Sequence, residues 1–159
     1  MQLNQLLRQI RIELIKKQGF SLVSRTAQQP AGDASVFLCD TMGEVPMFYA
    51  ASDVAFVAGS LVPIGGHNLL EPAMLGVPIV TGPHNFNAQD IADLFVDLGA
   101  CRRVTGTEDL VTTISELLTD RELAARLGNA GQSVLDENRG ALERLLVLLE
   151  PLLSDRQPT

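Results

Sequence analysis

The sequence predicts an α/β fold: a Rossmann-like, doubly wound parallel sheet with helices on both faces and a helical carboxyl-terminal segment. Short apolar runs alternate with amphipathic stretches along most of the chain. Two of these runs are continuously apolar, over residues 54–58 and 77–80, which is typical of strands covered on both faces. Glycines and polar residues cluster directly after both runs, where ligands bind in open α/β sheets.

The first expected element is a helix. Leu3, Leu7, Ile10 and Leu14 recur at helical spacing and predict a helix over residues 2–18, which Gly19 would close. A doubly wound domain normally opens with a strand, so we expect the sheet to lack its first strand. After this helix, strands and helices are expected to alternate. The predicted strands cover residues 21–25, 35–39, 54–58, 77–81 and 101–104, and the predicted helices lie near residues 43–50, 68–75, 88–98 and 107–118.

Residues 119–153 are expected to be wholly helical. Thr119 or Asp120 can cap the first helix, and Gly140 separates it from a second one. The second helix carries a broad leucine stripe, which packs either on its own domain or on a part outside this chain. Residues 1–153 are therefore expected to form a single domain, followed by a flexible tail over residues 154–159.

Composition excludes several classes of protein. Of the 159 residues, 46% are hydrophobic and 19% are charged, which excludes an acidic disordered chain. A net charge of −7 argues against binding to nucleic acid or anionic lipid, which needs clustered Lys and Arg. No signal peptide or run long enough to span a membrane is present. Cys39 and Cys101 are expected to be reduced thiols.

The charges are unevenly distributed. Between Thr26 and Cys101 there is no Lys or Arg, whereas acidic residues recur throughout this segment. An anion bound there would need donors other than local basic side chains. The segment after the strand at residues 54–58 offers such donors, because Gly59, Gly65 and Gly66 precede a short helix. Backbone N–H groups, a helix dipole and the Ser60 hydroxyl could hold a phosphate without a lysine.

His67 and Glu71 are four residues apart, so they share one face if the helix begins by His67. A carboxylate one turn from the phosphate end can accept two hydrogen bonds from a ribose diol. Pro72 suits a first helical turn and therefore places Glu71 near the helix start. A surface pair and a metal site with His84 are the alternatives.

Polar residues also follow the other strands. His84, Asn85 and Asn87 follow the strand at residues 77–81, where asparagine amides suit a polyhydroxylated ligand. The turn that contains Asp40 and Glu44 follows an earlier strand. It could line the same rim, which is the edge of the sheet where the strands have their carboxyl ends. Its alternative role is a helix cap, in which Asp40 or Thr41 pairs with Glu44 in a capping box.

These motifs resemble the carboxyl-terminal half of the 3-deoxy-D-manno-octulosonic acid (Kdo) transferases, which are two-domain glycosyltransferases of the B-type fold. The resemblance covers essentially the whole chain. It rests on Asp-Thr-Met-Gly-Glu at 40–44, Ala-Gly-Ser-Leu-Val at 58–62, Gly-Gly-His-Asn-Leu-Leu-Glu-Pro at 65–72 and Gly-Pro-His-Asn-Phe-Asn at 82–87.

The resemblance implies a function. Such enzymes transfer Kdo from CMP-Kdo to the lipid A precursor in lipopolysaccharide biosynthesis, at the cytoplasmic face of the inner membrane of Gram-negative bacteria. They invert the anomeric centre and use no catalytic metal or other cofactor. The carboxyl-terminal domain holds the donor nucleotide, whereas the acceptor and the general base belong to the amino-terminal domain. We therefore expect this chain to bind CMP, to contain no catalytic base and to be inactive alone.

The resemblance also implies residue roles. Ser60, Gly65, Gly66, His67 and Asn68 lie at the phosphate end, and Glu71 lies at the ribose hydroxyls. The resemblance alone assigns the cytosine base of the nucleotide to a turn, which is formed by Thr41, Met42, Gly43 and Glu44. His84, Asn85 and Asn87 lie near the donor sugar, although relatives have Thr at position 85. A basic segment with an arginine near the phosphate, which opens the family's donor domain, is absent from this chain.

Two other functions remain open on the sequence. One is the donor domain of a B-type glycosyltransferase that uses a UDP-sugar, and the other is a non-catalytic α/β binding module. A surface meant for a second domain, together with the leucine stripe, also predicts self-association of the chain.

Overall fold

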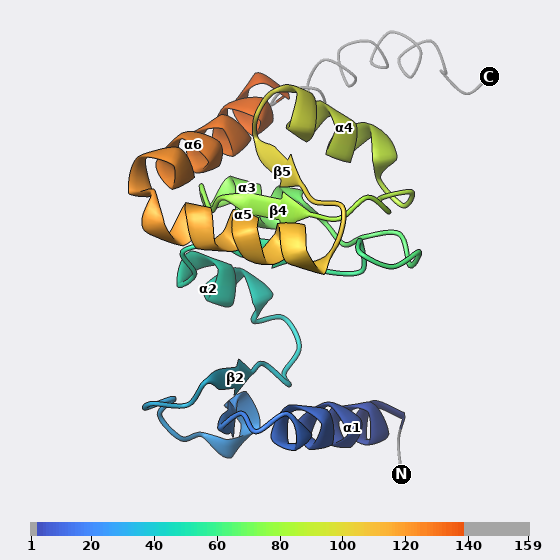
Figure 1. Ribbon diagram of the computed structural model, residues 1–159, viewed down its shortest axis with the longest axis vertical. Coiled ribbons are helices and arrows are strands. Elements are labelled where there is room, and N and C mark those ends of the chain that lie inside the picture. Colours follow the sequence, from blue (N-terminus) through green and yellow to red (C-terminus); the bar gives the residue numbers. More distant parts are fainter. Residues whose placement is uncertain (1–2, 139–159) are drawn as a thin grey trace, which may run out of the picture. The chain divides into compact units, whose positions relative to one another are not determined.

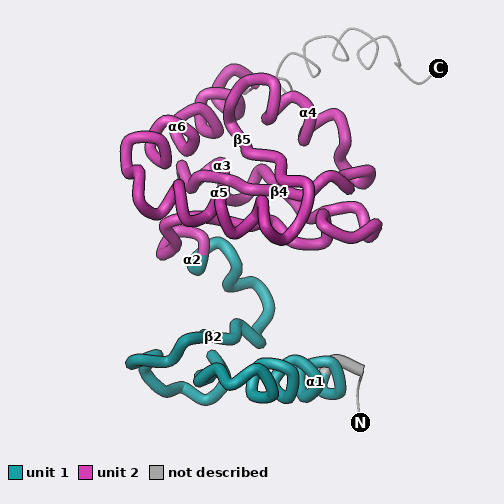
Figure 2. Tube along the Cα trace, in the orientation of Figure 1, with its two compact units in different colours: residues 1–48 teal, residues 49–159 magenta. Residues whose placement is uncertain are grey.

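The computed structural model describes residues 3–138 (Figure 1). The chain divides into two compact units, residues 1–48 and residues 49–159, which are coloured separately in Figure 2. Each unit contains a parallel sheet, and the two are described separately below. No helix among the described residues combines the length and the apolarity that crossing a membrane requires.

The first unit contains a helix followed by a two-stranded parallel sheet. Gly19 ends the helix with φ +82°, and its N–H donates to the Lys16 carbonyl at 2.9 Å. In the sheet, Val23 lies opposite Phe37. The elements are α1 (Leu3–Lys17), β1 (Leu22–Ser24), the 3-10 helix η1 (Arg25–Ala27), β2 (Val36–Leu38) and the start of α2 (Val45–Ala50).

The first unit has no buried apolar core among its described residues. Ser24 is its only described residue classed as buried, and Leu14 and Phe20 are 56% and 54% exposed. Aromatic packing is limited to Phe37 and Phe48, whose ring centroids lie 5.7 Å apart. Polar contacts, described below, therefore hold much of this unit together.

The second unit is built on a three-stranded parallel sheet in the order β3, β4, β5. Helices follow each strand, so the chain crosses over between neighbouring strands as parallel pairing requires. The elements are β3 (Ala55–Val57), α3 (Leu70–Met74), β4 (Ile79–Thr81), α4 (Gln89–Asp97), β5 (Cys101–Arg103), α5 (Thr107–Thr119) and α6 (Arg121–Asn138).

Each face of this sheet has its own apolar cluster. Val57 and Ile79 pack with residues of α3, α4 and α6, among them Phe95 and Val134. The next residue of β4, Val80, belongs to a second cluster with Leu117 of α5 and Leu127 of α6. Successive residues of a strand point to opposite faces, so a continuously apolar strand feeds both clusters. Figure 1 shows α5 and α3 on opposite sides of β4.

The predicted α/β class, with parallel strands and helices on both faces, is confirmed. All five strands lie within their predicted ranges, although each is only three residues long. Asp120 caps α6, because its Oδ1 accepts the Leu123 N–H at 2.9 Å. The strands form two separate sheets, where one was expected. Gly140, the leucine stripe and the tail at residues 154–159 lie outside the described residues.

Candidate functional site

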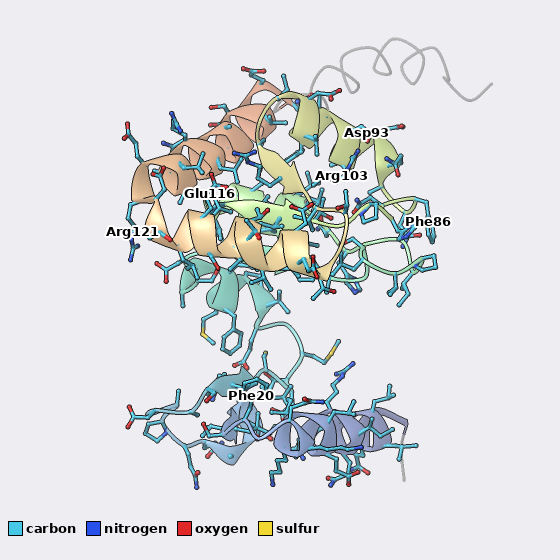
Figure 3. The ribbon with its side chains drawn as sticks, in the orientation of Figure 1. Phe20, Phe86, Asp93, Arg103, Glu116 and Arg121 are labelled. Atoms are coloured by element: carbon cyan, nitrogen blue, oxygen red, sulfur yellow. The ribbon has the colours of Figure 1, made fainter. Side chains whose placement is uncertain are left out.

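Two loops meet at the carboxyl ends of β3 and β4 in the second unit. The first loop runs over residues 58–69 and the second over residues 82–88. The His84 N–H donates to the Ser60 carbonyl at 2.9 Å, and the Asn87 N–H donates to the Gly65 carbonyl at 3.2 Å. Figure 3 labels Phe86 at the exposed tip of the second loop. The sequence prediction that these segments lie together is therefore confirmed.

Glycine is required at the centre of the first loop. Gly59, Gly65 and Gly66 have φ values of +79°, +110° and +72°, and the Gly66 N–H closes the loop on the Gly59 carbonyl at 2.9 Å. A Cβ atom on Gly66 would lie 2.6 Å from the Asn85 Oδ1. The two loops therefore touch at a distance that no side chain at position 66 would permit.

Ser60 links the two loops through hydrogen bonds of its buried hydroxyl. Its side chain is fully buried, and its hydroxyl donates to the Val57 carbonyl at 2.7 Å. The same oxygen accepts the Gly82 N–H at 2.8 Å. The hydroxyl that the sequence places beside a phosphate is thus engaged within the chain in this structure, and its phosphate contact stays a prediction.

His67 lies before the short helix and not on it, because α3 begins at Leu70. The condition for a shared helical face of His67 and Glu71, a helix that begins by His67, is therefore not met. Asn68 organises this turn instead: its Oδ1 accepts the Leu70 N–H at 3.0 Å, and its Nδ2 donates to the Glu71 Oε1 at 3.2 Å. The N-cap residue of α3 is Leu69, which makes no side-chain capping hydrogen bond, so the Asn68 side chain forms an Asx turn directly before the helix.

Glu71 lies in the first turn of α3, as predicted from Pro72. The carboxylate is half-buried, and its Oε2 accepts no hydrogen bond from any described residue. Burial and the nearby charge of Glu71 raise the pKa of the Tyr49 phenol. Glu71 therefore has one oxygen engaged within the chain and one without a hydrogen-bond partner among the described residues, and its contact with a ribose stays a prediction.

Asn85 also acts within the protein. It is 2% exposed, its Oδ1 accepts the Thr81 hydroxyl at 2.9 Å, and its Nδ2 donates to the Gly82 carbonyl at 2.7 Å. By contrast, Asn87 is exposed and His84 is half-buried. Of the three residues predicted near a donor sugar, His84 and Asn87 are the ones with side chains accessible at the rim.

The turn predicted to bind the nucleobase, residues 41–44, lies in the first unit. Met42 is 95% exposed, and Gly43 has φ +80°. Both oxygens of Glu44 are engaged: Oε1 accepts Arg25 Nη2 at 3.0 Å, and Oε2 accepts Arg25 Nε at 3.1 Å and the Thr41 hydroxyl. Hydrogen bonds from Thr41 and Arg25 lower the pKa of Glu44.

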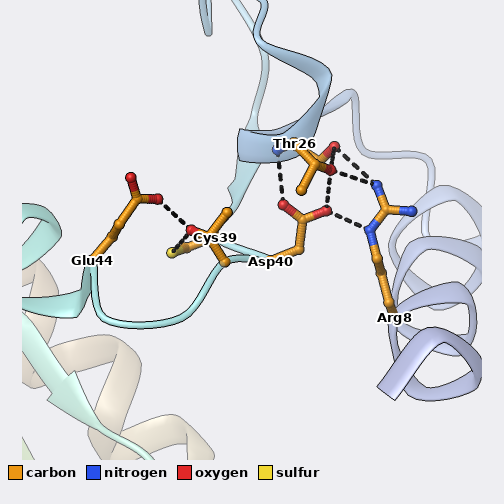
Figure 4. Close-up of polar contacts among 7 residues, drawn as sticks. Arg8, Thr26, Cys39, Asp40 and Glu44 are labelled. Carbon is orange, nitrogen blue, oxygen red and sulfur yellow. Dashed lines mark hydrogen bonds and ion pairs between the residues drawn. The ribbon is translucent and has the colours of Figure 1, made fainter. Parts of the chain in front are cut away.

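Asp40 anchors the start of the same turn (Figure 4). Its side chain is 4% exposed and accepts the Thr26 N–H at 2.9 Å, the Thr26 hydroxyl at 2.6 Å and Nε of Arg8. Burial would raise the pKa of Asp40, but the hydrogen bonds from Thr26 and Arg8 together lower it to about 2.

The predicted capping box at α2 is therefore wrong. Asp40 bonds back to η1 and α1, and the Thr41 hydroxyl meets the Glu44 carboxylate. The basic partners Arg8 and Arg25 are residues that sequence reasoning missed. Arg25 directly precedes the segment without Lys or Arg, whereas nothing in the sequence singles out Arg8. Within residues 3–138 no cluster of three His, Cys, Asp or Glu side chains has a geometry that could hold a metal ion.

Comparison with known proteins places this geometry in a family. The sequence profile described as "Glycosyl transferases group 1" matches residues 17–134. This chain belongs to the group 1 glycosyl transferases. It is 46% identical to the 3-deoxy-D-manno-octulosonic acid transferase of Haemophilus influenzae over 143 residues, which is 89% of this chain and 34% of that protein. It is 35% identical to the Bordetella pertussis enzyme of the same name over 125 residues, 79% of this chain and 29% of that one.

A solved structure is also similar. The C-terminal CMP-Kdo binding domain of WaaA from Acinetobacter baumannii superimposes with a TM-score of 0.75 and is 36% identical, covering 78% of this chain and 65% of that one. The resemblance to Kdo transferases that the motifs indicate is confirmed. The chain spans about a third of the length of the curated relatives it matches.

Proposed function

We propose that this group 1 glycosyl transferase chain is the donor-binding half of a Kdo transferase, which transfers Kdo from CMP-Kdo to a lipid A precursor in lipopolysaccharide biosynthesis. The observation that carries this proposal is the likeness, in sequence and in structure, to the CMP-Kdo binding domain of WaaA. The Kdo transferases of Haemophilus influenzae and Bordetella pertussis support it through sequence identity.

The loop after β3 offers the donors that a phosphate would need. The N–H groups of Gly65 and His67 make no hydrogen bond with any residue that the structure describes. Because local Lys and Arg are absent, such amides are the available source of positive potential. In this proposal they and Ser60, Gly66 and Asn68 surround the phosphate.

The remaining parts of the donor are assigned to other residues of the chain. The ribose diol meets the Oε2 of Glu71, and the Kdo sugar lies beside His84, Asn85 and Asn87. The nucleobase is assigned to residues 41–44. No metal is part of the proposal, so EDTA is expected to leave nucleotide affinity unchanged.

The chain alone is proposed to bind nucleotide without turnover. The general base and the acceptor site would belong to an amino-terminal domain, and inversion at the anomeric carbon requires both. The complete enzyme would act at the cytoplasmic face of the inner membrane of a Gram-negative bacterium as a peripheral protein. The isolated chain would then also be prone to self-association, which sedimentation at several concentrations would detect.

Calorimetric titration with CMP tests the proposal. We expect saturable binding, and we expect Glu71→Ala to weaken it by about tenfold or more, because hydrogen bonds to a charged group are lost. Glu116→Ala is the matched control, because Glu116 lies on α5 and is exposed (Figure 3). The proposal fails if millimolar CMP does not bind, or if Glu71→Ala binds as well as the parent chain.

Competition between nucleotides tests the identity of the donor. We expect CMP to displace UDP at equal concentration. A clear preference for UDP would instead indicate a UDP-sugar donor, and binding of neither nucleotide would favour a non-catalytic module.

A further inference from the structure

A hollow of about 580 Å³ lies in the second unit, beside the last strand of its sheet. Its walls come from α4, from β5 and the turn before it, and from α6 (Figure 1). β5 pairs only with β4 among the described strands, so its outer edge is not covered by another strand. None of the wall residues belongs to the segments assigned to the nucleotide or the donor sugar, so the proposed function leaves this hollow without a role.

Three arginines gather at this hollow. Arg102 and Arg103 lie on β5, and Arg126 lies on α6. They are three of the four Lys and Arg side chains within residues 49–138, so the fold concentrates the positive charge of this unit in one place. No described Asp or Glu side chain lines the hollow. The negative net charge of the whole chain therefore conceals a local cluster of positive charge.

Most of the donors on these arginines are unused. Arg102 and Arg126 are exposed, and their side chains form no ion pair or hydrogen bond with any described residue. Arg103 donates from Nη2 to the Asp93 Oδ1 at 2.5 Å (Figure 3), but its Nε is buried and has no hydrogen-bond partner among the described residues. A guanidinium has five N–H donors, so all three side chains can bind a further acceptor.

The other wall surfaces are uncharged. Burial raises the pKa of the Cys101 thiol to about 12, although the charge of Arg103 opposes this, so the thiol stays protonated at neutral pH. Val96, Leu123 and Leu127 contribute aliphatic surface. Apolar walls with a few directed polar groups are typical of sites for small ligands. Here every charge on the described walls is positive, which selects an anion.

We propose that this hollow binds a phosphomonoester group, which is held by the guanidinium groups of Arg102, Arg103 and Arg126. Guanidinium N–H groups match pairs of phosphate oxygens through parallel hydrogen bonds. A phosphomonoester carries a charge of about −1.5 to −2 near pH 7, which the unpaired charges of Arg102 and Arg126 can balance. A carboxylate offers one charge and two oxygens, so it would leave part of the cluster without a partner. The aliphatic walls would contact the carbon skeleton of the ester.

Glycerol 3-phosphate and glycerol, which differ only in the phosphate group, test the site. Each is titrated into the whole 159-residue chain and followed by the backbone amide signals of Gly99 and Arg103 in NMR spectra. We expect saturable shifts with glycerol 3-phosphate and none with glycerol. Arg102→Gln and Arg126→Gln should each weaken glycerol 3-phosphate about tenfold, because charge-assisted hydrogen bonds are lost.

Arg121→Gln is the matched control, because it removes the same charge from the same helix as Arg126→Gln. The Arg121 side chain pairs with Asp53 and lies outside the hollow. The affinity for glycerol 3-phosphate should therefore stay within about twofold of the parent chain, since an exposed ion pair contributes little.

A second measurement distinguishes a soluble ester from a lipid headgroup. Cosedimentation of the chain with phosphatidylcholine vesicles is compared in the presence and absence of phosphatidic acid, which carries a phosphomonoester. Binding that needs phosphatidic acid and is lost in Arg126→Gln assigns the hollow to a lipid headgroup. Binding of glycerol 3-phosphate without binding to these vesicles assigns it to a soluble ester.

The inference is overturned if neither ligand binds, or if Arg102→Gln and Arg126→Gln bind both ligands as well as the parent chain does. Shifts confined to Gly65 and His67 would place the phosphate at the loop after β3 and would also overturn it. The proposed function is tested separately by the CMP titration with Glu71→Ala, because Glu71 does not line the hollow. The two failures are therefore distinguishable.

Discussion

The carboxylate of Asp40 shows how one side chain can organise a unit whose described residues form no apolar core. Its side chain is 4% exposed, and it connects α1, η1 and the end of β2. Burial of an unpaired carboxylate would be costly, but here each oxygen has donors. Hydrogen bonding to the charged form outweighs burial, which explains why the pKa falls and does not rise.

Acidification should therefore weaken the first unit over a defined range. The pKa of Asp40 is about 2 in the folded chain against an ordinary value of 3.8. A lowered pKa gives stability that is complete above about pH 4 and is lost as the pH falls through about 2. The Thr26 amide proton, which Asp40 accepts at 2.9 Å, reports this titration directly in NMR spectra. A midpoint near 3.8 would contradict the expected effect, and Asp40→Asn should abolish the titration.

Buried polar side chains at the rim of the second unit follow the same rule. Ser60 and Asn85 are 0% and 2% exposed, and each has a donor and an acceptor within the chain. Such groups fix the two loops in place, because an unsatisfied polar group in this position would be expensive. The rim is therefore formed before any ligand binds.

At the scale of elements, α6 packs unusually close to the chain that leads into β4. Gly128 is buried in α6, and a Cβ atom there would collide with the Gly76 carbonyl oxygen. At Gly131, one turn further along the same helix, a Cβ atom would make an ordinary contact of 3.5 Å with the Ala73 Cβ. The close approach of helix and loop thus depends on the first glycine and not on the second.

Alanine at the two positions should have opposite effects. Alanine is favoured over glycine in a helix by about 1 kcal/mol, so Gly131→Ala should be neutral or stabilising. At Gly128 that gain is outweighed, because overpacking costs about 1–3 kcal/mol and the obstructing atom belongs to the backbone. Urea unfolding followed by far-ultraviolet circular dichroism measures both. A Gly128→Ala variant as stable as the parent chain would contradict the packing described here.

At the scale of the molecule, the two units are stabilised differently. The second has two apolar clusters on the faces of its sheet, whereas the described part of the first has none. Apolar burial is the dominant favourable contribution to folding, so polar contacts and short strands leave the first unit only weakly stable. Local opening should therefore begin there.

Amide hydrogen exchange can compare the two units within one sample. Val23 and Val80 are the middle residues of β1 and β4, and both strands are parallel. We expect the Val23 amide to exchange at least about tenfold faster, because the described part of its unit contains no apolar core that opening would expose. Equal protection at the two sites would show that the units open together.

Local sequence patterns were sufficient for most elements. Apolar runs placed every strand, Gly19 and Asp120 marked helix boundaries, and the two glycine- and asparagine-containing loops were expected at one rim. These features depend on neighbours in sequence, which is why they could be predicted. The start of α3 was misplaced because the side-chain contacts of Asn68 that precede the helix lie within a loop whose course the sequence leaves open.

The sequence by itself determined the fold class, the family resemblance and the segments that form the rim. Only the tertiary structure decided which polar side chains face inward. Ser60, Asn85 and Glu44 were candidates for a ligand and Asp40 was a candidate for a helix cap, yet each is engaged by another partner within the chain. The physical reason is that hydrogen-bond partners are chosen by proximity in space: Asp40 meets Arg8 across 32 residues, and Ser60 meets Gly82 across 22.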